Sequence, residues 1–338
     1  MKQGTIISAR NISIGYHKKK AKLPLFDDLS FDLYTGELIC LVGSNGAGKS
    51  TLLRSISGLQ PLLNGNIYIR DKNLNRYTER TLSKIIGLVL TDKTSTGGLT
   101  VRELVELGRY PYTGFFGQLS DSDKVIVEKA MTDVGIFHKA DSYMAELSDG
   151  ERQKVMIAKV LAQECPIILL DEPTAFLDIE SRTEIIGLLH TLALIQNKTI
   201  LLSTHDIDLA LHLSDRLFLL SKEKGLRTGV TEDIILSGLL DNFFSNKIIT
   251  FDKTSGSFIP KHTSGKPQIY VETNHTLQRW VESFFNKKGY IISTNKEDKS
   301  LFSIKLSSPT SILVEEMGRA IELQSFGELD KWIRERMD

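Results

Sequence analysis

The sequence predicts an α/β protein with a glycine-rich loop between a strand and a helix, a helical insertion, and a small second α/β domain. Three observations carry this prediction. Strand-like apolar runs alternate with helical patterns, one run leads into a glycine loop, and the composition changes after residue 252. Of 338 residues, 41% are hydrophobic and 25% charged, which favours a globular class over disordered, fibrous or disulfide-stapled classes. We expect domains over residues 1–252 and 268–338, with a linker over 253–267.

The charge and the cysteine content narrow the class of protein. Lys plus Arg number 42 and Asp plus Glu number 42, so the formal net charge of +0 gives no overall attraction to nucleic acid or anionic membranes. Cys40 and Cys165 are isolated in the sequence, and we expect buried thiols in a reducing cytoplasm. No apolar run approaches the ~18 residues that cross a bilayer, and no signal-peptide pattern opens the sequence. We therefore expect a cytoplasmic protein that another subunit would hold at a membrane.

Short apolar runs bounded by turn residues predict the strands of the first domain. One run leads directly into Gly43, and the residues after Ser50 have the apolar spacing of a helix. Helical patterns lie between the later strands, which favours a sheet covered by helices. In order, the expected strands are Thr5–Ile14, Leu29–Leu33, Glu37–Val42, Asn66–Ile69, Ile85–Leu90, Ile167–Leu170, Thr199–Ser203 and Arg216–Leu220.

The segment of about residues 100–160 differs from its surroundings. Helix-like stretches over Val101–Leu107 and Lys124–Val134 are separated by Gly108, Pro111 and a glycine-containing turn region. This pattern predicts a helical insertion in the α/β domain.

The second domain shows strands, helices and no recognisable site motif. The expected elements are strands at Gln268–Glu272, Tyr290–Thr294 and Leu301–Leu306, a helix with an apolar face from Leu277 to Phe285, and a last helix beginning at Ser325. Residues 309–323 have no clear pattern. The aromatic helix face is typical of a core, and we expect the domain to fold by itself.

The glycine loop has the spacing of a phosphate-binding loop. Residues 43–50 read G-S-N-G-A-G-K-S and fit G-x-x-x-x-G-K-[ST]. A loop with little Cβ obstruction, followed by a helix N-terminus, directs backbone N–H groups at phosphates. Lys49 would then reach the β and γ phosphates of a nucleotide, and Ser50 would bind Mg²⁺.

Two carboxylates follow the apolar run Ile167–Leu170. Asp171 and Glu172 at the end of a buried strand are costly unless a positive group lies there, and Mg²⁺ is a natural partner. We expect Asp171 to hold the metal and Glu172 to orient or deprotonate an attacking water. A solvated strand end is the simpler alternative, but the phosphate loop favours the catalytic interpretation.

A short segment before this strand identifies a family. Residues 147–151 read L-S-D-G-E, and the spacing of Ser148 and Glu151 alone would be explained by a helix capping box. Together with the phosphate loop and the carboxylates, the segment resembles the signature motif of ATP-binding cassette (ABC) proteins, usually LSGGQ. The likeness extends over about Thr5 to Leu240. Further matches are Tyr16 to the aromatic that stacks on adenine, Phe176, Leu177 and Asp178 to the D-loop, and His205 to the switch histidine.

The resemblance implies a fold and an activity. We expect a P-loop ABC-type nucleotide-binding domain with a helical subdomain, and a homodimer that encloses two ATP molecules and hydrolyses them with Mg²⁺. The catalytic residues would be Lys49, Glu172 and His205, and the Mg²⁺ ligands Ser50 and Asp171. The remaining nucleotide contacts would be Tyr16, Gly43, Ser44, Asn45, Gly46, Ala47, Gly48, Lys49, Ser50 and Thr51, with Ser148, Asp149, Gly150 and Glu151 contacting the ATP of the opposite subunit.

The helical insertion resembles a narrower group. Leu99–Val105 and Leu107–Pro111 are similar to importer ATPases that serve permeases for iron-siderophore complexes, haem or vitamin B12. This likeness implies that residues around Leu99 to Gly117 contact a membrane permease, and that a substrate-binding protein acts indirectly. It places the chain on the inner face of the cell membrane. Solutes meet the permease and the binding protein, so the sequence does not identify the solute. Some importer ATPases also carry a regulatory appendage, and we expect a modulatory role for the second domain.

The sequence departs from the family pattern in two places, one that shortens a side chain and one that adds negative charge. The usual Gln after the strand ending at Leu90 is replaced by Thr91 and then Asp92. We expect Thr91 to act through a water and Asp92 to face the permease or solvent, because successive strand residues point in opposite directions. Asp149 and Glu151 add negative charge to the signature segment, and Glu151 should repel phosphate unless it points away.

Two other functions are alternatives to an importer ATPase. A soluble cassette ATPase that remodels nucleic acid or ribosomes typically has two cassettes or a long coiled coil, and the stretch between Ser50 and Asp171 is too short for the latter. The net charge of +0 also gives no nucleic-acid footprint. A P-loop small-molecule kinase would not need the signature, D-loop and histidine motifs together. The importer ATPase is therefore the favoured interpretation.

Overall fold

The computed structural model describes residues 4–18, 21–90, 98–245, 248–253, 256–261, 267–293, 302–316 and 318–336. Contacts between Cα atoms divide the chain into two units, Met1–Phe243 and Phe244–Asp338. The first unit thus ends before the boundary expected at residue 252. None of the described helices combines the length and apolar character needed to span a bilayer.

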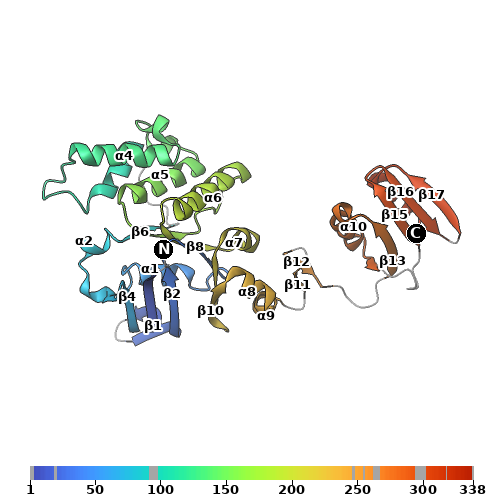
Figure 1. The fold of residues 1–338 in the computed structure, drawn as a ribbon, viewed down its shortest axis with the longest axis horizontal. Coiled ribbons are helices and arrows are strands. Elements are labelled where there is room, and N and C mark those ends of the chain that lie inside the picture. Colours follow the sequence, from blue (N-terminus) through green and yellow to red (C-terminus); the bar gives the residue numbers. More distant parts are fainter. Residues whose placement is uncertain are drawn as a thin grey trace. The chain divides into compact units, whose positions relative to one another are not determined.

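A mixed sheet forms the centre of the first unit (Figure 1). The described residues give it six strands in the order β10-β9-β3-β8-β7-β6, parallel except for the β10–β9 pair. Parallel strands put their carboxyl ends at one edge, so the residues that follow β3, β7 and β8 meet there. The strands are β3 (Leu38–Val42), β6 (Ile86–Val89), β7 (Ile167–Asp171), β8 (Thr199–Thr204), β9 (Arg216–Ser221) and β10 (Gly225–Val230).

A second, antiparallel sheet packs against this one. Its order is β2-β1-β4-β5, and Phe31 of β2 meets Phe218 of β9 edge to face at 5.3 Å, within one continuous apolar core. Both long strands extend beyond the apolar runs that predicted them, because their polar ends pair with each other as a hairpin. The strands are β1 (Thr5–Lys18), β2 (Ala21–Tyr34), β4 (Asn64–Ile69) and β5 (Lys72–Asn73).

Helices connect the strands, and the predicted helical insertion is confirmed between β6 and β7. Figure 1 shows its helices α4 and α5 packed together. The helices of the first unit are α1 (Lys49–Ile56), α2 (Glu79–Leu82), α3 (Val101–Glu106), α4 (Asp121–Asp133), α5 (Asp149–Ala162), α6 (Ile179–Leu194), α7 (Ile207–Leu213), α8 (Thr231–Leu236) and α9 (Leu239–Phe244), with 3₁₀ turns η1 (Leu74–Arg76), η2 (Leu107–Arg109), η3 (Phe137–Lys139) and η4 (Met144–Glu146).

A buried arginine holds the insertion together. Arg109 is 4% exposed, and its guanidinium donates to Asp123 Oδ1 at 2.8 Å, Glu164 Oε2 at 2.7 Å and the Ala162 carbonyl at 2.7 Å. The same group lies 3.9 Å from the centre of the Tyr112 ring. A buried charge requires such partners. The arginine therefore joins η2 to the start of α4 and the end of α5.

The prediction that both cysteines are buried thiols is confirmed. Cys40 and Cys165 are free and buried, and burial raises the pKa of both thiols to about 12. Neither thiol is therefore reactive at neutral pH.

The second unit contains its own sheet and core. The sheet order among the described residues is β14-β13-β15-β16-β17, and α10 and α11 bury Phe285 and Trp332 against one of its faces. A separate hairpin of β11 and β12 lies in the same unit. The elements are β11 (Ile249–Asp252), β12 (Ser257–Pro260), β13 (Gln268–Thr273), α10 (His275–Lys287), β14 (Ile291–Ser293), β15 (Ser303–Ser308), β16 (Ser311–Glu316), β17 (Arg319–Leu323) and α11 (Phe326–Arg334).

Two predictions for this region are corrected or completed. Strand β12 lies inside the segment predicted as a linker, where Phe258 packs on Phe251 with ring centres 5.1 Å apart. Only two apolar residues, Phe258 and Ile259, mark this strand, too few to show a period. Within the unassigned residues 309–323, strands β16 and β17 pair antiparallel. The last helix begins as predicted, with Ser325 at its N-cap.

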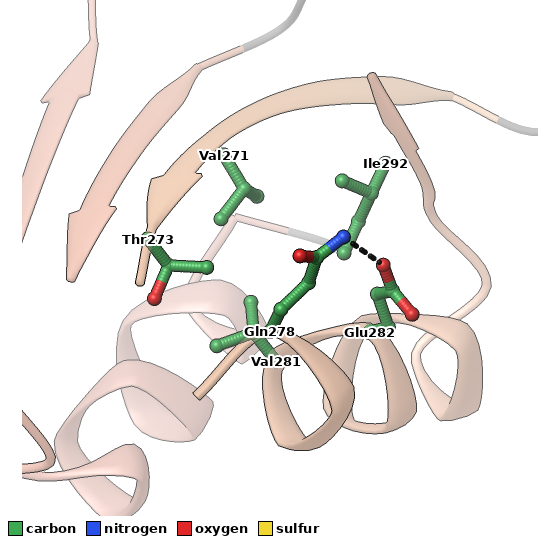
Figure 2. Close-up of a pocket in the computed structure, with 6 residues that line it drawn as sticks. All are labelled: Val271, Thr273, Gln278, Val281, Glu282 and Ile292. Atoms are coloured by element: carbon green, nitrogen blue, oxygen red, sulfur yellow. Dashed lines mark hydrogen bonds between the residues drawn. The ribbon is translucent and has the colours of Figure 1, made fainter. Parts of the chain in front are cut away.

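One small cavity lies between β13, β14 and α10 of this unit (Figure 2). It has a volume of about 70 Å³. Along α10, which forms one side of the cavity, Gln278 Nε2 donates to Glu282 Oε1 at 3.0 Å. Such a volume holds a few waters but no nucleotide. The lining residues are Val271, Thr273, Gln278, Val281, Glu282 and Ile292.

Candidate nucleotide site

The glycine loop lies where β3 passes into α1. All five residues of β3 are buried, and α1 begins at Lys49. Gly48 has a φ of +97°, and a Cβ there would lie 2.6 Å from Leu25 Cδ2. At Gly43 a Cβ would lie 2.4 Å from the Leu220 carbonyl oxygen of β9. Backbone sterics therefore require glycine at both ends of the loop.

The loop encloses the ammonium group of Lys49. This side chain is buried, and Nζ donates to the Gly43 carbonyl at 2.9 Å. Nζ also lies 3.3 Å from Glu172 Oε1. These oxygens balance the positive charge where the loop would receive a phosphate. The lysine and the carboxylate predicted from distant segments thus lie in direct contact.

The two carboxylates follow β7 at the same edge of the sheet. Asp171 is 6% exposed and its Oδ1 accepts a hydrogen bond from Ser203 Oγ at 2.6 Å. Ser203 Oγ in turn accepts from the Glu172 backbone N–H at 2.9 Å. Glu172 has a φ of +47°, a conformation that non-glycine residues rarely adopt. The surrounding bonds fix a strained turn that aims Glu172 at Lys49.

Ser203 is a site residue that the sequence did not reveal. It lies in β8, and the parallel register pairs it with Asp171. In the sequence, Ser203 is only a hydroxyl residue at the end of a predicted strand. The strand order that brings it to Asp171 cannot be predicted from the local sequence.

His205 joins the same contact chain. Its Nδ1 lies 3.3 Å from Glu172 Oε2, and its side chain is 58% exposed. The imidazole can therefore reach a group outside the protein while it contacts the carboxylate. Lys49, Glu172 and His205 thus form a continuous series of polar contacts at the strand ends.

Ser50 and Asp171 offer oxygen donors suited to Mg²⁺. A hydroxyl and a carboxylate are hard ligands, and Mg²⁺ in nucleotide sites takes one or two protein oxygens together with phosphates. The described residues hold no cluster of three or more His, Cys, Asp or Glu that would form a complete metal cage. The donor set therefore fits a metal that arrives with a nucleotide.

Tyr16 lies at the side of the loop. Its hydroxyl is 3.0 Å from Thr51 Oγ1, and the residue is 54% exposed. The contact links the aromatic residue of β1 to α1. Because the Tyr16 ring is held through its hydroxyl and exposed, a face of the ring is available for another aromatic ring to stack on. The loop residues Ser44, Asn45 and Gly46 are exposed as well, whereas Ala47 is buried.

The signature segment begins α5 with the predicted capping box. Glu151 N donates to Ser148 Oγ at 3.3 Å, and Glu151 Oε2 accepts from Ser148 N at 2.8 Å. Lys139 Nζ lies 3.6 Å from Glu151 Oε1. The bonds from Ser148 lower the pKa of Glu151. Both carboxylate oxygens are thus engaged within the chain, and Lys139 offsets part of the negative charge.

Asp149 has a counter-charge within its own helix. Its Oδ1 lies 3.3 Å from Arg152 Nη1, and Arg152 Nε donates to the Met144 carbonyl at 3.1 Å. The added acid of the signature is therefore partly neutralised by a neighbouring guanidinium. Gly150, between the two acidic residues, is buried.

The D-loop residues precede α6. Asp178 is the N-cap of α6, and its Oδ1 accepts from Ser181 N at 2.7 Å. Phe176 has a φ of +64° and is 89% exposed. The turn therefore presents a large apolar ring to the outside. Thr91 and Asp92, the residues at the position of the usual Gln, lie outside the described residues.

The predicted permease-contact region carries exposed aromatics. Tyr110, Phe115 and Phe116 are 74%, 99% and 85% exposed. Phe115 and Phe116 meet edge to face with ring centres 5.5 Å apart. Arg80 anchors this segment by donating to the Pro111 carbonyl at 3.0 Å. Exposed apolar groups gathered on an anchored turn are typical of a protein contact surface.

Comparisons with known proteins point to one family. A sequence profile of the ABC transporter family matches residues 26–175. The chain is 34% identical over 267 residues to an uncharacterised ABC transporter ATP-binding protein of Methanocaldococcus jannaschii, covering 79% of this chain and 91% of the relative. It is 32% identical over 246 residues to the ferric enterobactin transport ATP-binding protein FepC of Escherichia coli, covering 73% and 89%. The dimeric structure of MJ0796, a bacterial ABC transporter cassette, matches with a TM-score of 0.59 at 28% identity, covering 67% of this chain and 99% of that one.

Proposed function

The chain belongs to the ABC transporter family, and we propose that it is the ATP-hydrolysing subunit of an importer for iron chelates, haem or cobalamin-like solutes. The observation that carries the site assignment is the contact of Lys49 Nζ with both the Gly43 carbonyl and Glu172 Oε1. This contact joins Lys49, the proposed phosphate-binding cation, to Glu172, the proposed general base. The iron-chelate class rests on the likeness to the enterobactin relative.

Hydrolysis follows from the charges at the loop. When ATP binds, Lys49 exchanges its oxygen partners for the β and γ phosphates, and Glu172 loses its ion pair. The freed carboxylate orients a water and takes its proton as the water oxygen bonds to the γ phosphorus and the bond to ADP breaks. His205, beside Glu172, holds the γ phosphate. Ser50 and Asp171 would bind Mg²⁺, which supplies charge neutralisation on the phosphates when present.

The second phosphate contact comes from another copy of the chain. ABC ATPases dimerise and pair with permease subunits in importer complexes. Ser148, at the N-terminus of the 14-residue helix α5, lies where backbone N–H groups attract an anion. In this proposal residues 148–151 face the γ phosphate held by the partner's loop, with Asp178 and the D-loop beside them, and closure of the dimer drives the permease.

A purified complex tests this function. The chain is co-purified with its permease subunits, and the complex is reconstituted in vesicles with a binding protein. We expect Mg²⁺-dependent ATP hydrolysis and uptake of a ferric siderophore, haem or cobalamin. Hydrolysis that responds to ribosomes or nucleic acid but to no permease would favour the soluble remodelling ATPase instead.

The exposed aromatics give a prediction about permease binding. Replacing Phe115 and Phe116 together by Ser should weaken permease association roughly 30-fold, since truncating buried interface aromatics costs about 2 kcal/mol or more. The permease-free ATPase rate should stay unchanged, because these residues lie outside the nucleotide site. The measurement is co-purification with the permease. Leu194→Ser, at a side chain 65% exposed on α6, is the matched control. Equal association of the double variant and the control would place the contact elsewhere.

The second unit gives a prediction about domain independence, since we propose for it a modulatory rather than catalytic role. Its core residues form a cluster separate from that of the first unit. A chain ending at Lys261 keeps the β11–β12 hairpin, and should hydrolyse ATP within about twofold of the full rate, because separate cores fold separately. Steady-state ATPase assays on both lengths provide the measurement. Loss of hydrolysis in a folded, dimer-forming truncation would show that the second unit completes the active site.

A further inference from the structure

The first turn of α6 touches two parts of the nucleotide site. On one side Gly150 of the signature helix packs against Ser181, so closely that a Cβ on Gly150 would lie 2.5 Å from Ser181 Oγ and 2.8 Å from Ser181 Cβ. Both distances are shorter than any real Cβ contact. The signature glycine is therefore required by a contact within its own chain, apart from any need to admit a phosphate.

Through Arg182 the same turn also contacts the segment that carries the catalytic histidine. Arg182, the next residue, forms an ion pair with Asp206. Asp206 is the N-cap of α7 and accepts from Leu209 N at 2.9 Å. It directly follows His205, whose Nδ1 lies 3.3 Å from Glu172 Oε2. Two adjacent residues of α6 thus contact the signature helix and the segment that carries His205.

Further contacts make the first turn of α6 rigid. Ser181 N donates to Asp178 Oδ1 at 2.7 Å, which ties the turn to the D-loop. One turn further along α5 and α6, Lys154 Nζ lies 2.6 Å from Glu184 Oε2. This ion pair also joins the two helices, which are labelled in Figure 1. A displacement of α5 at Gly150 must therefore move α6 or be resisted by it.

We propose that Ser181 and Arg182 are positioning residues that couple the signature helix to His205 and Glu172 of the same subunit. This inference rests on the proposed function, in which the signature helix touches one ATP while Glu172 and His205 of the same subunit act on the other. The turn of α6 then links the two ATP sites of the dimer. A γ phosphate that seats α5 at one site sets the hydrolytic groups at the other.

A double substitution tests the contact. In the full-length chain, Gly150→Ala should lower kcat for ATP hydrolysis about tenfold or more with KM changed less than about twofold, because its Cβ displaces α5 from α6 without altering the phosphate loop. Ser181→Gly removes both clashing atoms, so Gly150→Ala/Ser181→Gly should recover to within about threefold of wild type. Ser181→Gly alone should lower the Hill coefficient for ATP towards 1, because the link between sites is loosened.

Three further variants separate this link from a general loss of stability. Arg182→Ala should lower kcat at constant KM, with partial recovery in Arg182→Lys, because the ion pair with Asp206 is retained. Lys129→Gln breaks an exposed ion pair within α4, which is no part of the link between α5 and α6, and should leave the Hill coefficient as in wild type. Thermal unfolding checks that each variant is folded.

The outcomes distinguish the two proposals. A wild-type chain without Mg²⁺-dependent hydrolysis would overturn the proposed function and this inference with it. An active wild type in which Ser181→Gly fails to rescue Gly150→Ala would overturn the inference alone and assign Gly150 to phosphate approach only.

Discussion

Replacing Glu172 by Gln should abolish ATP hydrolysis while nucleotide still binds. The amide keeps the shape of the side chain but cannot accept the proton of the attacking water, and loss of a general base lowers rates by roughly 10²–10⁴-fold. Lys49 Nζ lies 3.3 Å from Glu172 Oε1, so the neutral amide also frees the ammonium from an ion pair before ATP binds. We therefore expect ATP affinity at least equal to that of wild type, and a closed dimer that accumulates with ATP and Mg²⁺.

Gel filtration with ATP and Mg²⁺, together with a phosphate-release assay, measures both effects. Glu128→Gln is a matched control, since Glu128 also pairs with a cation, Arg102 at 3.2 Å, but on the surface of the helical insertion. The control should hydrolyse ATP as wild type does. A Glu172→Gln protein that stays monomeric and hydrolyses at the normal rate would remove Glu172 from the role of base.

The parts of the site that could be predicted are those encoded in short continuous segments. The phosphate loop at residues 43–50 follows one strand and starts one helix, so its spacing alone specifies the local structure. The same holds for the capping box of Ser148 and Glu151, in which each partner bonds to the other. Each pattern lies within one short segment, and the predicted passage from strand to helix and the predicted capping box are confirmed.

Contacts between distant segments could not be predicted in the same way. Ser203 reaches Asp171 only because β8 lies beside β7, and Ser181 meets Gly150 only because α6 packs on α5. Strand order and helix packing are set by the whole core. The sequence likewise predicted that the charge of Glu151 would repel a phosphate. Its contact with Lys139, which offsets part of that charge, joins two segments that no local pattern relates.

The hairpin of β16 and β17 was missed for a different reason. Ile312 and Val314 alternate with partly exposed residues, yet β17 is mostly exposed and carries little apolar signal. The connection contains Gly318 at a φ of +80° and not the Asn-Gly or Asp-Gly pair that marks a tight hairpin. An edge strand with a polar surface has little periodicity, so residues 309–323 gave no prediction.

Replacing Lys49 by Ala should weaken ATP binding roughly 100-fold and reduce hydrolysis to background, since a desolvated ammonium that faces phosphate contributes several kcal/mol and water cannot replace it. The substitution also leaves the Gly43 carbonyl and Glu172 without the donor they share, whose Nζ lies 2.9 Å and 3.3 Å away. A buried acceptor that loses its partner costs about 1–3 kcal/mol, so the free protein should unfold at a lower temperature as well. Calorimetric titration with ATP and thermal unfolding without nucleotide separate the two effects, and Lys129→Ala, at an exposed lysine paired with Asp133, should change neither. If Lys49→Ala bound ATP with wild-type affinity, the phosphate-loop assignment would be wrong, because no other described residue places a buried cation inside the loop.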